Sequence, residues 1–491
     1  MLVQNLHGHS NTGRYDQNLS LSRLRYLYIL LRMSGFGGNN FGGGNGGRNN
    51  SSWGGGRHNS RGGRSGGRGR SGGRSGGRSG GRGRSSGRGR GGGGRGGAYI
   101  NDNIAIKLHA SIYASSKNHD NNNSNGYNSY NNQNYNAYHP VTSVAIWETG
   151  GNVKIFTGGK DGFWRLWSFN NQTNRFDKEF EHQMGGPVES LVVASNFLFC
   201  GFEGISKALP EITVGMIHAW NLASPNDPPL EFHMHPNIPY AHPTAVKRLI
   251  VVEGQKIISG SKDGSIKLWT FEPPSANNPK GGFMLTQNIL GHAREITGLV
   301  DVGSLLWSCS TDGAIRIWDM TKADAPCQHC ITMSSSMQNS LPNGQSNNNS
   351  GPGHTNAVTG LVKFTSSTTS KNFVLSCSLD GTVKAWDGIN GQCVFSENHS
   401  EGVVSMSMIG DMNGKPCLLI GCESGAMFIR NLEPTPKIQQ PFSTLVHLNS
   451  NNASLHNGAV RSLCQGPAGT FYTSGDDGKV FVCQITGDLG L

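Results

Sequence analysis

The chain lacks several features that would point to a secreted, membrane or catalytic protein. No cysteine precedes Cys200, and the ten cysteines that follow are not densely or evenly spaced as in a secreted disulfide framework, so a nuclear or cytoplasmic setting is expected. No apolar run approaches the roughly 18 residues that a membrane span needs, which predicts a soluble protein. The motifs GxxxxGK[ST], GxSxG and HExxH are also absent, so we expect neither an enzyme nor a cofactor.

Charge divides the chain into two unlike parts. Residues 1–97 hold 17 arginines, no lysine and one acidic residue, Asp16, for a net charge of +16. The other 394 residues hold 25 basic and 30 acidic residues, for a net charge of −5. The chain's overall charge of +11 therefore comes from its first 97 residues alone.

Residues 34–97 consist mainly of Gly, Arg, Ser and Asn and contain almost no apolar side chains. Such a composition cannot bury enough surface to offset the entropy of ordering, so a disordered, low-complexity tail is expected. Its GGR and GRGR units resemble the RGG segments of RNA-binding proteins. Arginine binds phosphate and stacks on bases, which predicts RNA binding; the alternative is a solvated linker. The candidate RNA-binding residues are Arg61, Arg64, Arg68, Arg70, Arg74, Arg78, Arg82, Arg84, Arg88, Arg90 and Arg95.

Residues 1–33 form a separate N-terminal extension of uncertain role. The segment from Leu19 to Met33 is apolar and carries arginines, as a mitochondrial transit segment does, but its apolar run is too short for a secretory signal. The preferred interpretation is that the natural chain starts at Met33 and that the preceding residues are an extension introduced by gene prediction.

The rest of the chain is organised around a repeated stretch, GSKDGSIKLW, from Gly260 to Trp269. Related stretches occur at 158–167, 310–319, 378–387 and 475–484, and each reads as an Asp-Gly hairpin turn followed by an alternating strand. The expected turn glycines are spaced by 53, 49, 49, 68, 44 and 53 residues, which fits four-stranded propeller blades with loop insertions. These glycines are Gly162, Gly215, Gly264, Gly313, Gly381, Gly425 and Gly478.

A histidine precedes each expected turn, and the dipeptides Gly291-His292, Gly353-His354, Trp318-Asp319 and Trp386-Asp387 accompany the repeat. With these features the chain resembles the WD40 repeat family, which implies an all-β, seven-bladed β-propeller over residues 139–491. The resemblance further implies a hydrogen-bonded network of His, Ser or Thr, Asp and Trp within a blade. The matching sets are His139, Thr157, Asp161 and Trp167; His242, Ser259, Asp263 and Trp269; His292, Ser308, Asp312 and Trp318; and His354, Ser376, Asp380 and Trp386.

Three longer stretches, 186–201, 401–421 and 459–478, are similar to the propeller of plant-type CCCH zinc-finger/WD40 proteins. That family's zinc finger should lie upstream, where this chain has no cysteine. A finger of that type cannot be built here, so any RNA binding must depend on the tail.

Residues 98–138 are expected to join the tail to the propeller. The alternation of Ile104, Ile106 and Leu108 predicts a strand from Ile104 to Ile112 that supplies the missing outer strand of blade seven, followed by an Asn-rich linker. The polar insertion from Ser334 to Gly353 is expected to be a disordered surface loop.

Three blades depart from the pattern. In blade two Cys200 replaces the serine, in blade six Ser424 and Arg430 replace Asp and Trp, and in blade seven Cys483 replaces Trp. Blades six and seven should therefore depend more on strand packing.

Two further features allow alternative interpretations. Cys327-Gln-His-Cys330 has a metal-like spacing, but no second ligand pair accompanies it, which favours an outer strand over a zinc site. Lys160 and Lys262 precede the turn aspartates of blades one and three, as a basic patch or simply as exposed turn lysines. No metal site is expected.

The sequence thus supports two functional hypotheses. The first is a non-enzymatic scaffold that binds protein partners through its propeller and RNA non-specifically through its tail. The second is a protein-binding adaptor or substrate receptor whose tail is only a spacer or a target of arginine methylation.

Overall fold

The computed structural model describes residues 105–115, 138–206, 209–224, 226–235, 237–252, 256–273, 281–333, 353–411, 414–434, 440–449 and 455–486. The tail with its eleven candidate arginines, the N-terminal extension, the Asn-rich linker and nearly all of the insertion at 334–353 lie outside these ranges. Within the described ranges no helix has the length and apolarity that crossing a membrane requires.

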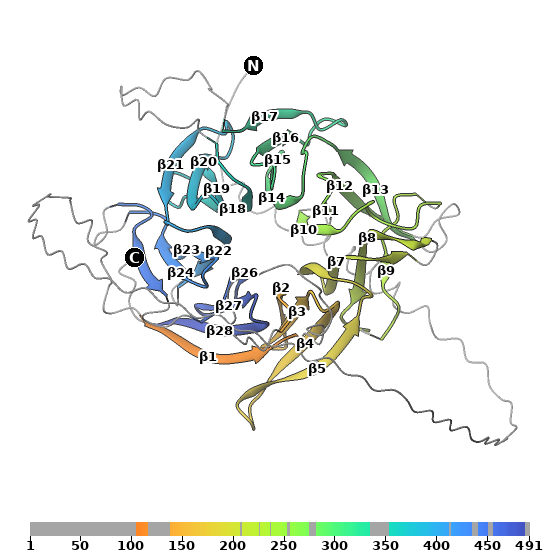
Figure 1. Ribbon diagram of the computed structural model, residues 1–491, viewed down its shortest axis with the longest axis horizontal. Helices are drawn as coiled ribbons and strands as arrows, with labels where there is room; N and C mark the ends of the chain where they lie inside the picture. Colours follow the sequence, from red (N-terminus) through yellow and green to blue (C-terminus); the bar gives the residue numbers. More distant parts are fainter. Residues whose placement is uncertain are drawn as a thin grey trace, which may run out of the picture. The chain divides into compact units, whose positions relative to one another are not determined.

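The described chain folds into seven antiparallel sheets of four strands each, confirming the expected all-β, seven-bladed propeller. In six blades the four strands follow one another along the sequence, and the innermost strands contact one another in the closed cycle β2, β6, β10, β14, β18, β22, β26 and back to β2. Figure 1 shows these sheets following one another around the ring.

The first four blades are as follows. Their strands are β2 Val141–Thr149, β3 Asn152–Gly159, β4 Phe163–Asn170 and β5 Arg175–Gln183 in blade one; β6 Val188–Ala194, β7 Phe197–Ser206, β8 Leu209–Asn221 and β9 Leu230–Glu231 in blade two; β10 Val246–Val252, β11 Lys256–Ser261, β12 Ile266–Glu272 and β13 Gly282–Ile289 in blade three; and β14 Ile296–Val302, β15 Leu305–Ser310, β16 Ile315–Asp319 and β17 Cys327–Ile331 in blade four.

The remaining three blades complete the ring. Their strands are β18 Val358–Thr365, β19 Asn372–Ser378, β20 Thr382–Asp387 and β21 Cys393–Asn398 in blade five; β22 Val403–Gly410, β23 Pro416–Cys422, β24 Met427–Asn431 and β25 Thr444–Leu448 in blade six; and β26 Val460–Gln465, β27 Thr470–Gly475, β28 Lys479–Thr486 and β1 Ala105–Tyr113 in blade seven.

Blade seven is assembled from two distant parts of the sequence. Strand β1 pairs antiparallel with β28, from Ala105 opposite Thr486 to Tyr113 opposite Lys479 (Figure 1). A bulge between Leu108 and Ala110 interrupts the alternation that the sequence suggested. Leu108 is 48% exposed, whereas Ile112 is only 6% exposed and packs in the cluster that joins blades seven and one.

Six of the seven expected turn glycines have a positive φ, between 72° at Gly478 and 90° at Gly425. This left-handed conformation is strained for residues with a Cβ, which explains the Asp-Gly turns. The interpretation of Gly215 as a turn residue is wrong. Gly215 lies inside β8 opposite Glu203, because the residues inserted in blade two lengthen the β7–β8 hairpin instead of forming a loop after a short one.

Side-chain hydrogen bonds to the backbone join the inner strands of neighbouring blades at all seven seams. At six seams the bond links a polar side chain of one inner strand with a backbone group of the neighbouring inner strand. At the last seam the side chain comes from β27 instead of the inner strand. Around the ring the pairs are Thr142 with Val188, Ser190 with Leu249, Arg248 with Thr297, Thr297 with Val358, Thr359 with Val403, Ser405 with Val460, and Ser474 with Val141.

Candidate functional site

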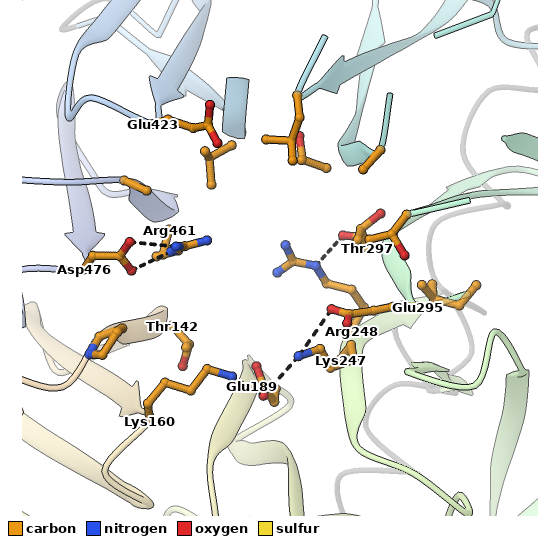
Figure 2. A pocket seen from close by; sticks show the side chains of 18 residues that line it. Thr142, Lys160, Glu189, Lys247, Arg248, Glu295, Thr297, Glu423, Arg461 and Asp476 are labelled. Atoms are coloured by element: carbon orange, nitrogen blue, oxygen red, sulfur yellow. Dashed lines mark hydrogen bonds and ion pairs between the residues drawn. The ribbon is translucent and has the colours of Figure 1, made fainter. Parts of the chain in front are cut away.

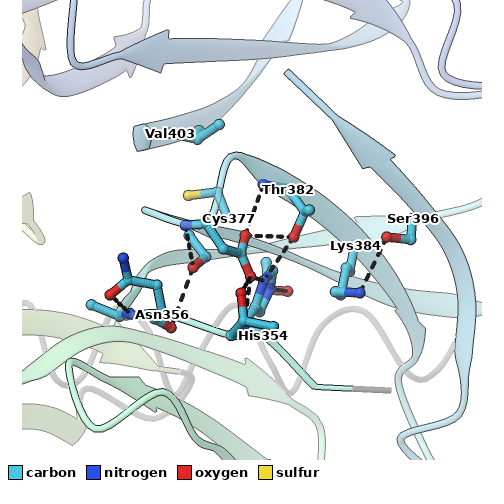
Figure 3. A network of polar contacts seen from close by, with 12 residues as sticks. His354, Asn356, Cys377, Thr382, Lys384, Ser396 and Val403 are labelled. Carbon is cyan, nitrogen blue, oxygen red and sulfur yellow. Dashed lines mark hydrogen bonds and ion pairs between the residues drawn. The ribbon is translucent and has the colours of Figure 1, made fainter. Parts of the chain in front are cut away.

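The complete four-residue network occurs in blade five, where Ser376 is its centre. Trp386 Nε1 donates to Ser376 Oγ over 2.8 Å, and His354 Nε2 lies 2.7 Å from the same oxygen. His354 Nδ1 lies 3.1 Å from Asp380 Oδ2, and Thr382 Oγ1 donates to Asp380 Oδ1 (Figure 3). Because the serine oxygen accepts from the indole, its own hydrogen is left for His354 Nε2, and Nδ1–H donates to the carboxylate.

The order Ser376, His354, Asp380 has the connectivity of a hydrolase triad, but its environment is different. Ser376 is fully buried and His354 is 2% exposed. The serine oxygen is already bound by the Trp386 indole, and burial lowers the pKa of His354 although Asp380 opposes this shift. A substrate carbonyl cannot reach this serine, so the network satisfies buried polar groups and holds the blade together.

Blade four repeats this geometry. His292 lies 3.0 Å from Asp312 and 2.8 Å from Ser308, and Trp318 Nε1 donates to Ser308 over 2.8 Å. Burial acts to raise the pKa of the Asp312 carboxyl, but hydrogen bonds from His292 and the backbone outweigh it and lower that pKa to about 2. The carboxylate is therefore held in its charged form.

Blade three contains the expected residues with one additional member. His242 Nε2 lies 2.7 Å from Ser259 Oγ, and Trp269 Nε1 donates to the same oxygen. Ser265 stands between the histidine and the aspartate: its Oγ lies 2.9 Å from His242 Nδ1 and donates to Asp263 over 2.6 Å.

In blade one the structure does not bring the four predicted residues together. Trp167 Nε1 donates to Thr157 Oγ1 over 3.0 Å, but Asp161 pairs with Arg165 at 2.8 Å instead of with His139. Arg165 lies four residues along the chain from Asp161 and also donates to the carbonyl of Ala114, at the end of the closing strand. A buried guanidinium at this position takes the carboxylate that histidine binds in other blades.

Blade seven, which was expected to depend more on strand packing, retains most of the network. His456 lies 2.9 Å from Asp477 and 2.8 Å from Thr473, which occupies the serine position. Only the tryptophan partner is replaced, by the buried Cys483. In blade six, by contrast, neither ring nitrogen of the buried His399 has a hydrogen-bond partner among the described residues.

The metal-like Cys327-Gln-His-Cys330 spacing falls on β17, the outer strand of blade four. A bulge at Gln328 places Cys327 opposite Trp318 and Cys330 opposite Arg316, so both cysteines lie on the same face of the sheet. Among the described residues they belong to no group of three or more possible metal ligands. Cys327 Sγ lies 3.2 Å from the carbonyl oxygen of His329.

The centre of the ring contains a cavity of about 400 Å³ that the sequence had not indicated. Each inner strand has a bulge after its first residue, and the extra residue faces this cavity. We call this set the mouth ring: Thr142, Glu189, Lys247, Thr297, Thr359, Val404 and Arg461. The signal that could have found it is the residue that follows the β-branched start of each inner strand.

Charged side chains of the mouth ring and the adjoining turns form ion pairs (Figure 2). Lys247 lies 3.1 Å from Glu189 and 3.3 Å from Glu295, and Lys160 also pairs with Glu189. Lys160 thus belongs to the mouth, whereas Lys262 is an exposed turn residue, so the two do not make a joint basic patch.

On the opposite side of the mouth, Arg461 makes a two-pronged pair with Asp476. Its Nε and Nη2 each donate over 2.6 Å to one carboxylate oxygen, and this hydrogen bonding raises the pKa of Arg461. The mouth is therefore a polar, preorganised surface that can receive a partner's side chains.

The family model "WD domain, G-beta repeat" matches residues 132–168, 238–270, 284–319 and 346–387. These ranges cover the inner three strands of blades one, three, four and five, the same blades in which the sequence predicted networks.

Curated relatives are similar over parts of the chain. The F-box/WD repeat-containing protein sel-10 of Caenorhabditis elegans is 29% identical over 27% of this chain and 17% of its own length. The zinc finger CCCH domain-containing protein 17 of Oryza sativa subsp. japonica is 26% identical over 37% of this chain and 34% of its own. COMPASS component SWD3 of Saccharomyces cerevisiae is 28% identical over 42% of this chain and 60% of its own. The chain thus spans about a third or less of the first two relatives.

The solved WD40 β-propeller domain of Doa1 superposes with a TM-score of 0.51 and 18% identity, covering 78% of this chain and 97% of that domain. This likeness concerns the fold. Together with the seven sheets and the matched repeats, it identifies the chain as a seven-bladed β-propeller in which four blades match the WD40 repeat.

Proposed function

We propose that this protein is a non-enzymatic scaffold, nuclear or cytoplasmic, that binds protein partners through the propeller and RNA through the Gly/Arg-rich tail. The observation that carries the proposal is the division of charge: +16 in residues 1–97 against −5 in the rest. The propeller alone is not basic, so a polyanion would bind to the tail.

The propeller's contribution is the mouth. Its polar groups are fixed by ion pairs and backbone contacts around the ring, which lowers the entropy lost when a partner binds. The Ser–His–Asp networks are buried and serve the fold, which supports a scaffold rather than an enzyme.

RNA binding by the tail follows from the chemistry of arginine. If about six to ten arginines contact phosphates, the logarithm of the affinity for a single strand falls with the logarithm of salt, with a slope near −0.7 per contact. Few aromatic residues interrupt the tail, so weak sequence preference is expected.

The second candidate is an adaptor or substrate receptor. The name of one relative, COMPASS component SWD3, favours it, because a component is part of a larger assembly. In this case the tail is only a spacer or a target of arginine methylation.

The decisive experiment compares the full chain with a chain that begins at Ala98, measuring retention of single-stranded RNA across a salt series. We expect the full chain to bind with a steep salt dependence and the shortened chain to bind little. Equal binding by both would refute the tail's role. A matched variant with lysine at the eleven candidate tail positions keeps the charge and tests whether planar guanidinium groups are needed.

A further inference from the structure

The residues that directly follow the seven bulges form a second layer below the mouth ring, one from each inner strand, and five of the seven line a second cavity. Six of the seven are serine or glycine, and the seventh is Arg248 of blade three. The layer consists of Ser143, Ser190, Arg248, Gly298, Gly360, Ser405 and Ser462. The small neighbours leave space for one long side chain, and Arg248 occupies it.

Arg248 lines both the 400 Å³ mouth cavity and a second cavity of about 170 Å³ below it. Its Nε donates to the carbonyl oxygen of Thr297, which fixes the plane of the guanidinium. Its two terminal nitrogens have no hydrogen-bond partner among the described residues. In Figure 2 this free edge points across the channel toward Arg461.

Charge distinguishes Arg248 from the other cations of the mouth. Lys160, Lys247 and Arg461 each have a carboxylate partner, whereas Arg248 forms no ion pair with any described residue. Arg461 leaves its Nη1 without a hydrogen bond to a described residue. Two guanidinium groups that face each other favour an anion between them, and a planar carboxylate fits both forks.

The surroundings indicate which anion fits. Four carboxylates line the cavity, those of Glu189, Glu295, Glu423 and Asp476. A phosphate group carries nearly two negative charges at neutral pH and is repelled by them more strongly than a single carboxylate. Glu423 is exposed at the rim and makes no ion pair with a described residue, so it can accept a basic side chain beside the inserted acid.

We propose that the channel mouth binds an acidic residue of a partner protein's extended peptide, whose carboxylate lies between Arg248 and Arg461 while a neighbouring basic residue meets Glu423. The mouth cavity lies within the size range of ligand pockets. This inference rests on the proposed protein-binding function of the propeller and specifies the chemistry of its ligand.

The test uses the immobilised full chain and arrays of nine-residue peptides with Lys fixed beside a central position and the other positions randomised. The central residue is Glu, Gln or phosphoserine. We expect the best Glu peptides to bind at least about tenfold more tightly than their Gln counterparts, a loss typical of an unpaired charge. Equal binding of Glu and Gln peptides, or tighter binding of phosphoserine peptides, would overturn the proposal.

Substitutions of Arg248 test whether the preference for Glu over Gln peptides depends on this residue. Arg248→Met keeps the length of the side chain and should abolish the preference for Glu, and Arg248→Lys should retain only part of it. Lys262→Ala removes one exposed charge outside the cavity lining and should leave the preference unchanged. A Glu preference that survives in Arg248→Met refutes the site. Melting temperatures of all variants identify any that fail to fold, in which case Arg248→Lys decides.

The outcome is separable from that of the proposed function. If Arg248→Met still retains the same protein partners as the unaltered chain, the channel site is refuted but the scaffold function stands. The RNA experiment tests the tail, so its outcome affects neither the peptide preference nor the retention of protein partners.

Discussion

Blades five and six place a histidine at the same point of the sheet in opposite chemical surroundings. His354 has a partner for each ring nitrogen, whereas His399 has none among the described residues and packs edge-on against Phe428 at 4.9 Å. Counted from the turn glycine, Ser376 and Trp386 in blade five correspond to Ile420 and Arg430 in blade six.

The difference shows that the histidine's position is fixed by packing and that the network is a separate, additional contribution. Without the network, burial lowers the pKa of His399 to about 3, so its ring is neutral at physiological pH. Blade six remains intact because apolar residues such as Leu418 and Ile420 are fully buried in the cluster it shares with blade five.

The largest loss of stability is expected from opening the ring, because blades five and six both depend on its closure. Deleting residues 98–113 removes β1, exposes Val480 and Val482 and costs on the order of 5 kcal/mol of buried apolar surface. Scanning calorimetry should show a markedly lower melting temperature. Deleting residues 34–97 is the control and should leave it unchanged; the opposite order would contradict the role of β1 as the closing strand.

A smaller effect is expected from Ser376→Ala, which removes the centre of the blade-five network. Trp386 Nε1 and His354 Nε2 both lose a partner, at about 1–3 kcal/mol for each unsatisfied buried group. Denaturant unfolding measures the loss. The exposed Ser396→Ala in the outer strand is the control and should change stability by less than about 0.5 kcal/mol.

The two histidines themselves test the comparison directly. His354→Leu removes the acceptor of the Ser376 hydroxyl and one of the donors to Asp380 and should cost about 2 kcal/mol, whereas His399→Leu removes two unsatisfied nitrogens and should be neutral or stabilising. Equal losses in the two variants would show that the network contributes little.

The smallest effect is a dependence on pH. Since the folded-state pKa of His399 is about 3, the native protein binds fewer protons than the unfolded chain below the usual histidine pKa near 6.5. Stability is full above that value and falls as the pH drops toward 3, by less than about 1 kcal/mol between pH 7 and pH 6. Urea titrations should show a shallower decline in His399→Leu, and an unchanged decline would contradict a neutral buried ring.

Much of the fold was predictable because propeller blades repeat local signals. Asp-Gly turns require a positive φ, and six of the seven expected glycines have it. Gly215 was predicted to be a turn residue from the spacing of the repeats. Spacing alone cannot reveal that the β7–β8 pairing continues through this residue.

The site was less predictable because side-chain partners depend on which way each strand faces. Asp161 occupies the same place in the repeat as the network aspartates, yet its carboxylate forms an ion pair with Arg165. Thr473 was not recognised as a substitute for serine, so the hydrogen-bonded network of blade seven was underestimated. The mouth ring follows from seven bulges, and a single residue such as Lys247 does not by itself reveal that its strand shifts register there.

The antiparallel pairing of β1 with β28 has a mechanical consequence. Ala105, where the chain arrives from the tail, lies opposite Thr486, near the other terminus. Tension applied between the two ends would load this ladder at one edge and peel its hydrogen bonds apart one pair at a time, instead of shearing them together. A pull on an anchored tail would thus release the outermost strand of one blade while the three strands inside it kept their pairing.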